Sequence, residues 1–302
     1  MNMDKRFKLQ FQATSDGQLL RDAISKFGIS KRGLTSIKYN GGALLVNGQE
    51  RTVRHVLNRG DLITVFFPPE EFSEGLIIEH KDLAILYEDD AFLILDKPPF
   101  LNIIPSREHP TGSLANYIGG YFEEKGIHST VHIVTRLDRD TSGIVCIAKH
   151  SHVHHLMGLQ QKQSLINKQY EAIVHGHLKE TEMSIEAPIG RKETSIIERE
   201  VRADGQYSHT DAKVVKRGYT KTMEPITHVR LKLHTGRTHQ IRVHMAHIGH
   251  PLVGDELYGG SRKLFNRQAL HCVFLELVHP LTGQQLRFTS EVPQPMSELL
   301  NN

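Results

Sequence analysis

The sequence predicts an α+β protein in which a small N-terminal α/β domain precedes a larger domain built on a mostly antiparallel, mixed sheet. From about residue 80, short apolar runs recur between turn residues, and only a few segments show helical periodicity. Strands and helices do not alternate as they do in parallel βαβ folds. No expected strand is followed by G-x-G-x-x-G, and no Walker sequence is present.

The composition is ordinary for a globular chain of about two domains. Hydrophobic residues make up 38% and charged residues 24% of the 302 residues. The most apolar stretch, residues 83–95, is broken by three acidic residues, so we expect no membrane span. The first seven residues lack the apolar core of a signal peptide. Cys146 and Cys272 stand among apolar residues and should be buried, reduced thiols in a cytoplasmic protein.

Positive charge is concentrated at the N-terminus. Residues 1–72 carry 11 Lys and Arg against 7 Asp and Glu, a net charge of +4, whereas residues 73–302 carry 26 against 27. This asymmetry indicates either a polyanion-binding arm or simply a basic soluble domain.

The N-terminal elements are expected in the order strand, two helices, strand, strand. Residues 6–11 alternate as a half-buried strand. Asp16 can cap a helix that ends at Gly28, and Ser30 can cap a second helix over residues 31–39. Further strands are expected at residues 43–46 and 62–67, and the Pro- and acid-rich residues after them form a linker to about residue 80.

The larger domain, residues 81–302, should contain seven main strands and three helices. The helices are expected at residues 113–124, 151–162 and 238–247, and a loop or edge hairpin at 194–208. The strands are expected at residues 83–87, 92–95, 144–148, 170–174, 228–233, 272–277 and 285–288.

One charged loop, residues 134–143, stands between apolar runs. Arg136 and Asp138 are two apart, so an extended backbone points them the same way. The turn formers Thr141, Ser142 and Gly143 lead into a buried strand. On these residues alone, a reactive carboxylate and a surface salt bridge are equally good interpretations.

Residues 17–67 resemble an S4-like RNA-binding domain. The resemblance rests on the apolar pattern of the first helix, on Leu45-Val-Asn-Gly48 and on Gly60-Asp61-Leu-Ile-Thr-Val65. It implies an RNA-binding domain over residues 1–72. Its helices would offer phosphate contacts, or only a solvated basic face, through Lys26, Lys31, Arg32 and Lys38.

Five segments between residues 83 and 293 resemble the RluA-like family of RNA pseudouridine synthases. Arg-Leu-Asp-x-x-Thr-Ser-Gly is present at residues 136–143, Tyr-x-Ala-x-Val-x-Gly at 170–176 and Gly-Arg-Thr-His-Gln-x-Arg-x-His at 236–244. Residues 249–255 and 279–283 also fit. The sequence departs from the family at Thr135, where histidine is usual, and in Lys97-Pro98-Pro99-Phe100, which lacks the glycine of Lys-Pro-x-Gly.

The resemblance implies an isomerase that converts uridine in structured RNA to pseudouridine. Asp138 would be the catalytic carboxylate and Arg237 its ion-pair partner, which keeps the carboxylate ionised and oriented. Tyr170 would stack on the uracil or help to move the C5 proton. Ile241 would line the base pocket or pack in the core, and Asp140 should be exposed.

The target base has to leave its helix to react, and Arg136 would take the vacated space or hold a phosphate. We expect large-subunit (23S-type) rRNA as the substrate, with tRNA as the alternative, and a monomer without cofactor. No metal is expected, because His239, His244, His247 and His250 match no zinc pattern and spread around a helix.

Two other functions fit the same residues. An inactive RNA-binding or assembly protein could keep the fold, although the intact functional residues argue against it. A glycoside hydrolase would need a second carboxylic acid, for which Asp140 is the only near neighbour.

Overall fold

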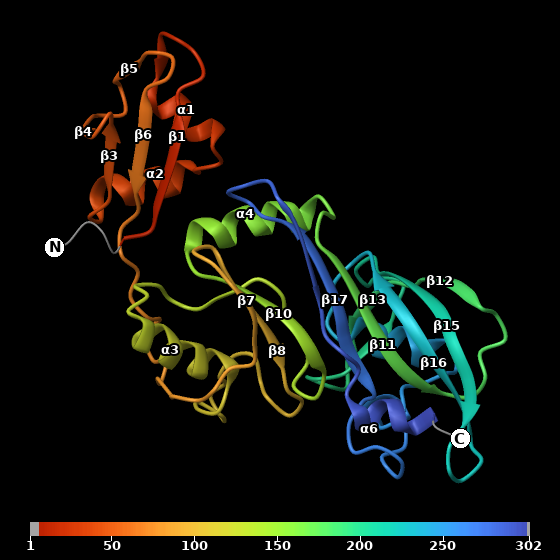
Figure 1. The fold of residues 1–302 in the computed structure, drawn as a ribbon. Helices are drawn as coiled ribbons and strands as arrows, with labels where there is room; N and C mark the ends of the chain where they lie inside the picture. The colour runs from red at the N-terminus through yellow and green to blue at the C-terminus, as the bar shows by residue number, and fades with distance from the viewer. Residues whose placement is uncertain (1–5, 301–302) are drawn as a thin grey trace.

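The computed structural model describes residues 6–300 of the chain. Residues 1–5 and 301–302 lie outside the described residues. The expectation that the chain has no signal peptide rests on residues 1–7, most of which are therefore not described. Within residues 6–300 the chain forms a four-stranded sheet near the N-terminus and a ten-stranded sheet in the larger part (Figure 1). The ten-stranded sheet is antiparallel except where β10 pairs β17, which confirms the predicted α+β class.

The N-terminal sheet has the order β1-β6-β3-β4 and its own apolar core. Ser30 caps the second helix as predicted, because its side chain accepts a hydrogen bond from the backbone N of Gly33. The cap predicted at Asp16 is wrong, since its carboxylate accepts from the backbone N of Arg59 at 2.7 Å. The elements are β1 Lys8–Gln12, β2 Gln18–Leu19, α1 Leu20–Lys26, α2 Lys31–Tyr39, β3 Ala43–Val46, β4 Gln49–Glu50, β5 Val56–Leu57 and β6 Leu62–Phe66.

The large sheet runs in the order β12-β15-β16-β11-β17-β10-β8-β7, with β18 beside β17 and β9 beside β10. All seven predicted strands of this domain are present. The strands are β7 Ile85–Glu88, β8 Phe92–Lys97, β9 His132–Ile133, β10 Ser142–Ala148, β11 Asn167–His175, β12 Glu182–Glu186, β15 His209–Tyr219, β16 Pro225–Leu233, β17 Leu270–Val278 and β18 Gln285–Thr289.

The three predicted helices are also present, at α3 Leu114–Lys125, α4 Ser151–Lys162 and α5 Gln240–His247. The region predicted as a loop or edge hairpin contains β14, which pairs with β13. β12 and β15 were not predicted. The remaining elements are β13 Ile189–Arg191, β14 Arg199–Val201, η2 Glu256–Tyr258, α6 Gln294–Ser297 and η3 Glu298–Leu300.

β8 and β10 are covered on both faces, which explains their unbroken apolar sequences. Alternate side chains such as Leu93 and Val145 pack in the core cluster that contains Phe122 of α3. Their neighbours, such as Ile94 and Cys146, belong to the main core with Met157 of α4. Successive strand residues point to opposite faces, so a strand between two layers of helices needs apolar residues at every position.

The N-terminal unit is seated against the start of α4 (Figure 1). Phe7 stacks on the imidazole of His150 at 4.5 Å between ring centroids, and Phe67 stacks on His152 at 5.1 Å. Burial lowers the pKa of both histidines to about 4, so both rings are neutral near pH 7. This contact fixes α1 and α2 relative to the large sheet.

Cys146 and Cys272 are both buried and free, as expected. Among residues 6–300, none of the helices is long and apolar enough to cross a membrane.

Candidate active site

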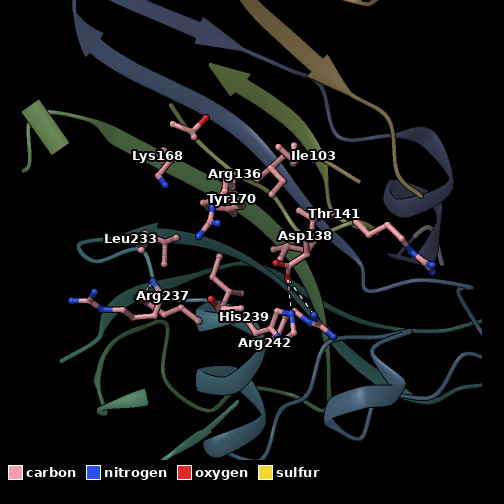
Figure 2. Close-up of a pocket in the computed structure, with 18 of the residues that line it drawn as sticks. Ile103, Arg136, Asp138, Thr141, Lys168, Tyr170, Leu233, Arg237, His239 and Arg242 are labelled. Atoms are coloured by element: carbon pink, nitrogen blue, oxygen red, sulfur yellow. Dashed lines mark hydrogen bonds and ion pairs between the residues drawn. The ribbon is translucent and has the colours of Figure 1, made fainter. Parts of the chain in front are cut away.

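A cavity of about 460 Å³ opens at the centre of the large sheet. Its walls are the loop before β10, the start of β11 and the loop that joins β16 to α5 (Figure 2). The volume falls in the range of small-molecule and nucleotide sites. Five of the sequence candidates line it, namely Arg136, Asp138, Tyr170, Arg237 and Ile241.

Asp138 stands in a loop that is tied down on both sides. Its own carbonyl accepts from the backbone N of Thr141 at 3.1 Å, which closes a turn. Upstream, the buried Thr135 hydroxyl accepts from the backbone N of Cys146 at 2.9 Å. Thr135, which stands where the family pattern usually has histidine, is thus a buried residue whose hydroxyl is hydrogen-bonded. The Asp138 side chain is 28% exposed, so it faces the cavity with part of its charge solvated.

Lys97 holds the other side of the same loop. Its buried Nζ donates to the carbonyls of Pro98, Leu101 and Arg139 at 2.8 to 3.0 Å. Burial lowers the pKa of Lys97 to about 7, with Asp140 opposing that effect. Three carbonyl acceptors match the three N–H groups of the charged ammonium. Phe100, which replaces the family's glycine, has a left-handed backbone with φ of 63°, the conformation in which glycine is favoured.

Gly143 allows β10 to approach β17 directly behind Asp138. A Cβ atom at this position would lie 2.3 Å from the carbonyl oxygen of Cys272. The same residue has φ of 111°. No other residue type fits here without moving one of the two central strands.

Arg242 is the arginine that pairs with Asp138. Its NH1 lies 3.1 Å from Asp138 Oδ2. Its other two nitrogens bind both oxygens of Asp255 at 2.7 and 2.8 Å, in a bidentate pair. Burial alone would lower the pKa of Arg242. The hydrogen bonds and charges of Asp255 and Asp138 outweigh burial and raise the pKa above its usual value. The guanidinium is therefore a fixed positive charge beside Asp138 (Figure 2).

The expected ion pair between Arg237 and Asp138 is not present among the described residues 6–300, so this prediction is wrong. The Arg237 side chain points away from Asp138 in Figure 2 and its Nε donates to the carbonyl of Tyr207 at 3.1 Å. Arg237 lies in the loop before α5 and is exposed, whereas Arg242 lies on the buried face of α5. Arg237 thus lies at the rim of the cavity, where an exposed guanidinium can meet a phosphate.

Gln240 gives the loop before α5 its shape. Its Oε1 accepts from the hydroxyl of Thr235 and the backbone N of Arg237, at 2.8 and 3.0 Å. Its Nε2 donates to the carbonyl of His209 and the hydroxyl of Thr210, both at 2.9 Å. A buried amide satisfied at both ends fixes the loop to β15.

His239 stands between Asp138 and Tyr258. Its Nε2 lies 3.8 Å from Asp138 Oδ2, and its Nδ1 lies 2.7 Å from the hydroxyl of Tyr258. Burial lowers the pKa of His239, so the ring is neutral at pH 7. Its φ of 58° is unusual for a residue with a side chain, and this turn carries the chain from the loop into α5.

Tyr170 lies on β11 and is 4% exposed, with its ring in the main core and at the cavity wall. Burial raises its pKa well above the usual value. The phenol stays protonated near neutral pH, so it can donate a hydrogen bond but cannot serve as a general base. Ile241 lines the cavity and also belongs to the main core, which includes Met245.

Asp140 is less accessible than expected. Its side chain is 15% exposed and forms an ion pair with Arg139 at 2.7 Å. Asp138 is the only carboxylate among the residues that line the cavity. The paired acid of most glycoside hydrolases is therefore missing from the cavity wall.

The sequence interpretation missed three residues of this site. Arg242 and Asp255 both stand inside quoted segments, so the signal was present but assigned to a neighbour. Lys168, two positions before Tyr170, points its side chain into the cavity (Figure 2). Burial lowers its pKa, which is typical of a lysine at the base of a pocket.

The four basic residues expected on the N-terminal helices are all exposed. Lys26 ends α1, and the other three lie on α2, which runs from Lys31 to Tyr39 and includes Arg32 and Lys38. None of the four lines the cavity.

One carboxylate is held by a buried arginine in a cavity that an aromatic ring and further basic residues line. This arrangement fits an enzyme site that takes an anionic, ring-containing substrate such as a nucleotide. Comparisons with known proteins identify the family. Residues 91–247 match the family model described as RNA pseudouridylate synthase. The chain belongs to this family, and it is an isomerase that converts uridine in RNA to pseudouridine.

Relatives and solved structures agree with this assignment. The chain is 49% identical to the RNA pseudouridine synthase YjbO of Bacillus subtilis, over 93% of this chain and 98% of that one. It is 35% identical to the ribosomal large subunit pseudouridine synthase D of Pseudomonas aeruginosa, over 86% and 83% of the two chains. The structure of human RNA pseudouridylate synthase domain containing 1 matches with a TM-score of 0.59 and 27% identity, over 74% and 86%.

Proposed function

We propose that this protein isomerises specific uridines of large-subunit rRNA and that Asp138 is the catalytic carboxylate. The observation that carries the proposal is the position of Asp138, the one carboxylate on the cavity wall, 3.1 Å from the buried Arg242. The rRNA substrate is supported by the relatives named ribosomal large subunit pseudouridine synthase D. Transfer RNA is the alternative substrate.

The reaction breaks the bond between N1 of uracil and C1′ of ribose and joins C5 to C1′. N1 gains a proton and C5 loses one. Asp138 attacks or stabilises the electron-poor centre that forms. Arg242 holds the carboxylate in place through a charge-assisted hydrogen bond. The neutral phenol of Tyr170 stacks on the base or donates to it, and Ile241 closes the apolar wall.

A base in a duplex cannot reach the cavity, so the target uridine must be unpaired or flipped out. Arg136 is exposed at the cavity mouth, where it takes the vacated space or binds a phosphate. Arg237 and Lys168 add positive charge to the same walls. We propose that the protein acts as a monomer, because the cavity walls come from neighbouring elements of one sheet and the loops that flank it. We place the reaction in the cytoplasm, in keeping with a ribosomal substrate.

Separate transcripts of large-subunit rRNA, small-subunit rRNA and tRNA test the substrate. Each is incubated with the protein, and pseudouridine is mapped by carbodiimide modification and primer extension. We expect modification at discrete positions of the large-subunit RNA. Modification of tRNA alone would overturn the proposed substrate and leave the enzyme class unchanged.

The N-terminal unit, residues 1–72, is proposed to be an S4-like domain that grips RNA through phosphates. The exposed side chains of α1 and α2 support this role, and the unit is seated on α4 beside the cavity-bearing sheet. Phosphate contacts carry little sequence information and are sensitive to salt.

Neutralising the four basic residues Lys26, Lys31, Arg32 and Lys38 with glutamine is expected to weaken RNA binding. The slope of log affinity against log salt should fall by about 3 to 4 if all four meet phosphates. Filter-binding titrations at several salt concentrations measure both quantities.

A control variant removes four exposed lysines of the larger domain instead. It should keep the salt slope within about 1 of the parent. Equal slopes for the parent and the N-terminal variant would refute the proposed role of α1 and α2. The control lysines are Lys125, Lys179, Lys213 and Lys221.

A further inference from the structure

A second group of polar side chains gathers outside the cavity, on the strands β12 and β15 and at the end of β16. Figure 1 shows these three strands together in the large sheet. His209 Nε2 lies 3.1 Å from Asp211 Oδ1, and His234 Nε2 lies 2.6 Å from Asp211 Oδ2. One possible ligand atom from each residue lies within 4.8 Å of the other two. The reaction described above uses none of these side chains.

The strand register brings these residues together. His209 and Asp211 are two apart on β15, so they point to the same face of the sheet. Ser184 of β12 is directly opposite Asp211. His234 follows Leu233, the last residue of β16, which pairs with Thr210. The two imidazole rings stack with centroids 4.1 Å apart, so both present Nε2 to one carboxylate.

We propose that His209, Asp211 and His234 bind a divalent transition-metal ion of the zinc class. Two imidazole nitrogens and one carboxylate oxygen are a common three-ligand set for such ions, with bonds of about 2.0–2.2 Å. Atoms that already lie 2.6 to 4.8 Å apart need only small side-chain shifts to surround an ion at that radius.

Ser184 adds a fourth polar atom to the same point. Its hydroxyl lies 2.7 Å from His209 Nε2 and 2.9 Å from Asp211 Oδ1. It either approaches the ion or holds a water in the open fourth position.

The ion would brace the wall of the cavity. The backbone N of His234 donates to the carbonyl of His209 at 3.1 Å, and the backbone N of His209 donates to the hydroxyl of Thr235 at 3.0 Å. The chain then continues through Gly236 and Arg237 at the cavity rim. Locking His234 to β15 therefore stabilises the loop that carries Arg237, and the ion takes no part in bond making.

The sequence interpretation predicted no metal because it considered only the histidines between residues 239 and 250. In the structure His244 is buried and bonded to Thr210 and Ala187, and His239 is bonded to Tyr258. The three proposed ligands span 25 positions of the chain, from His209 to His234. Only the strand pairing brings them together, so their spacing carries no recognisable motif.

Calorimetric titration of the full chain with Zn²⁺, after removal of metals by chelation, tests the site. We expect one tight site per chain. Asp211→Asn and His234→Ala should each weaken it at least about tenfold, since even residues behind the ligands change metal affinity by 10- to 100-fold. His247→Ala removes an exposed histidine outside the cluster and should leave the tight site unchanged.

Two further measurements make the result decisive. Circular dichroism in chelator establishes that each variant is folded before titration. At one fixed Zn²⁺ concentration, the melting temperature of the parent and of His247→Ala should rise more than that of Asp211→Asn. Equal affinity in all four proteins, or no tight site in the folded parent, would overturn the proposal. Both outcomes are independent of RNA modification.

Discussion

An Asp138→Asn variant is expected to lose on the order of 10⁴-fold or more of the isomerisation rate, the range seen when a nucleophile is removed. The amide keeps the size of the side chain but has neither the charge nor the nucleophilic oxygen of the carboxylate. Single-turnover assays with a target RNA, followed by digestion and chromatography of the nucleosides, measure the rate. Filter binding should show RNA affinity within a few-fold of the parent, because other groups contact phosphates.

Asp140→Asn is the matched control for this variant. Asp140 stands two positions away, forms its ion pair with Arg139 and does not line the cavity. Its rate should stay within about tenfold of the parent, because the loop is still held by Lys97 and Thr135. A larger loss of rate in Asp140→Asn than in Asp138→Asn would mean that Asp140, and not Asp138, is the catalytic carboxylate.

An Arg242→Met variant is expected to lose about 10²- to 10³-fold in rate, comparable to the loss of one preorganised electrostatic contact. The variant also removes the partner of Asp255, whose side chain is only 1% exposed. An unpaired buried carboxylate costs about 3–5 kcal/mol of stability. Rates should therefore be measured well below the melting temperature, alongside urea unfolding.

Asp255→Asn separates the two effects. It weakens the same buried ion pair, but Arg242 keeps its contact with Asp138 and Asp255 does not line the cavity. We expect a comparable fall in stability with a much smaller fall in rate. Equal rate losses in the two variants would mean that Arg242 acts only through the stability of the fold.

Much of the fold follows from local patterns in the sequence. β8 and β10 are continuous apolar runs because helices cover both of their faces. α4 begins and ends at the predicted residues. β15 was missed because many of its side chains are exposed and its charged residues hide the alternation. A strand near the edge of a sheet is defined by its partners more than by its own composition.

The site shows the same division between local and long-range information. The loop around Asp138 and the role of Tyr170 as a wall of the cavity follow from the motifs. The choice between Arg237 and Arg242 does not, because the two residues stand five positions apart in one segment. It depends on the turn at His239, where φ is 58°, and on Gln240, which ties the loop to β15. Neither feature has a signature in the sequence alone.

The most direct test is the release of tritium from C5 of uridine in labelled RNA, compared between the protein and Asp138→Asn in one RNA preparation. C5 loses its hydrogen only when it joins C1′, so release reports the isomerisation itself. We expect release by the parent protein and none above background by the variant. Release at similar rates by both proteins would contradict the assignment of Asp138 as the catalytic carboxylate.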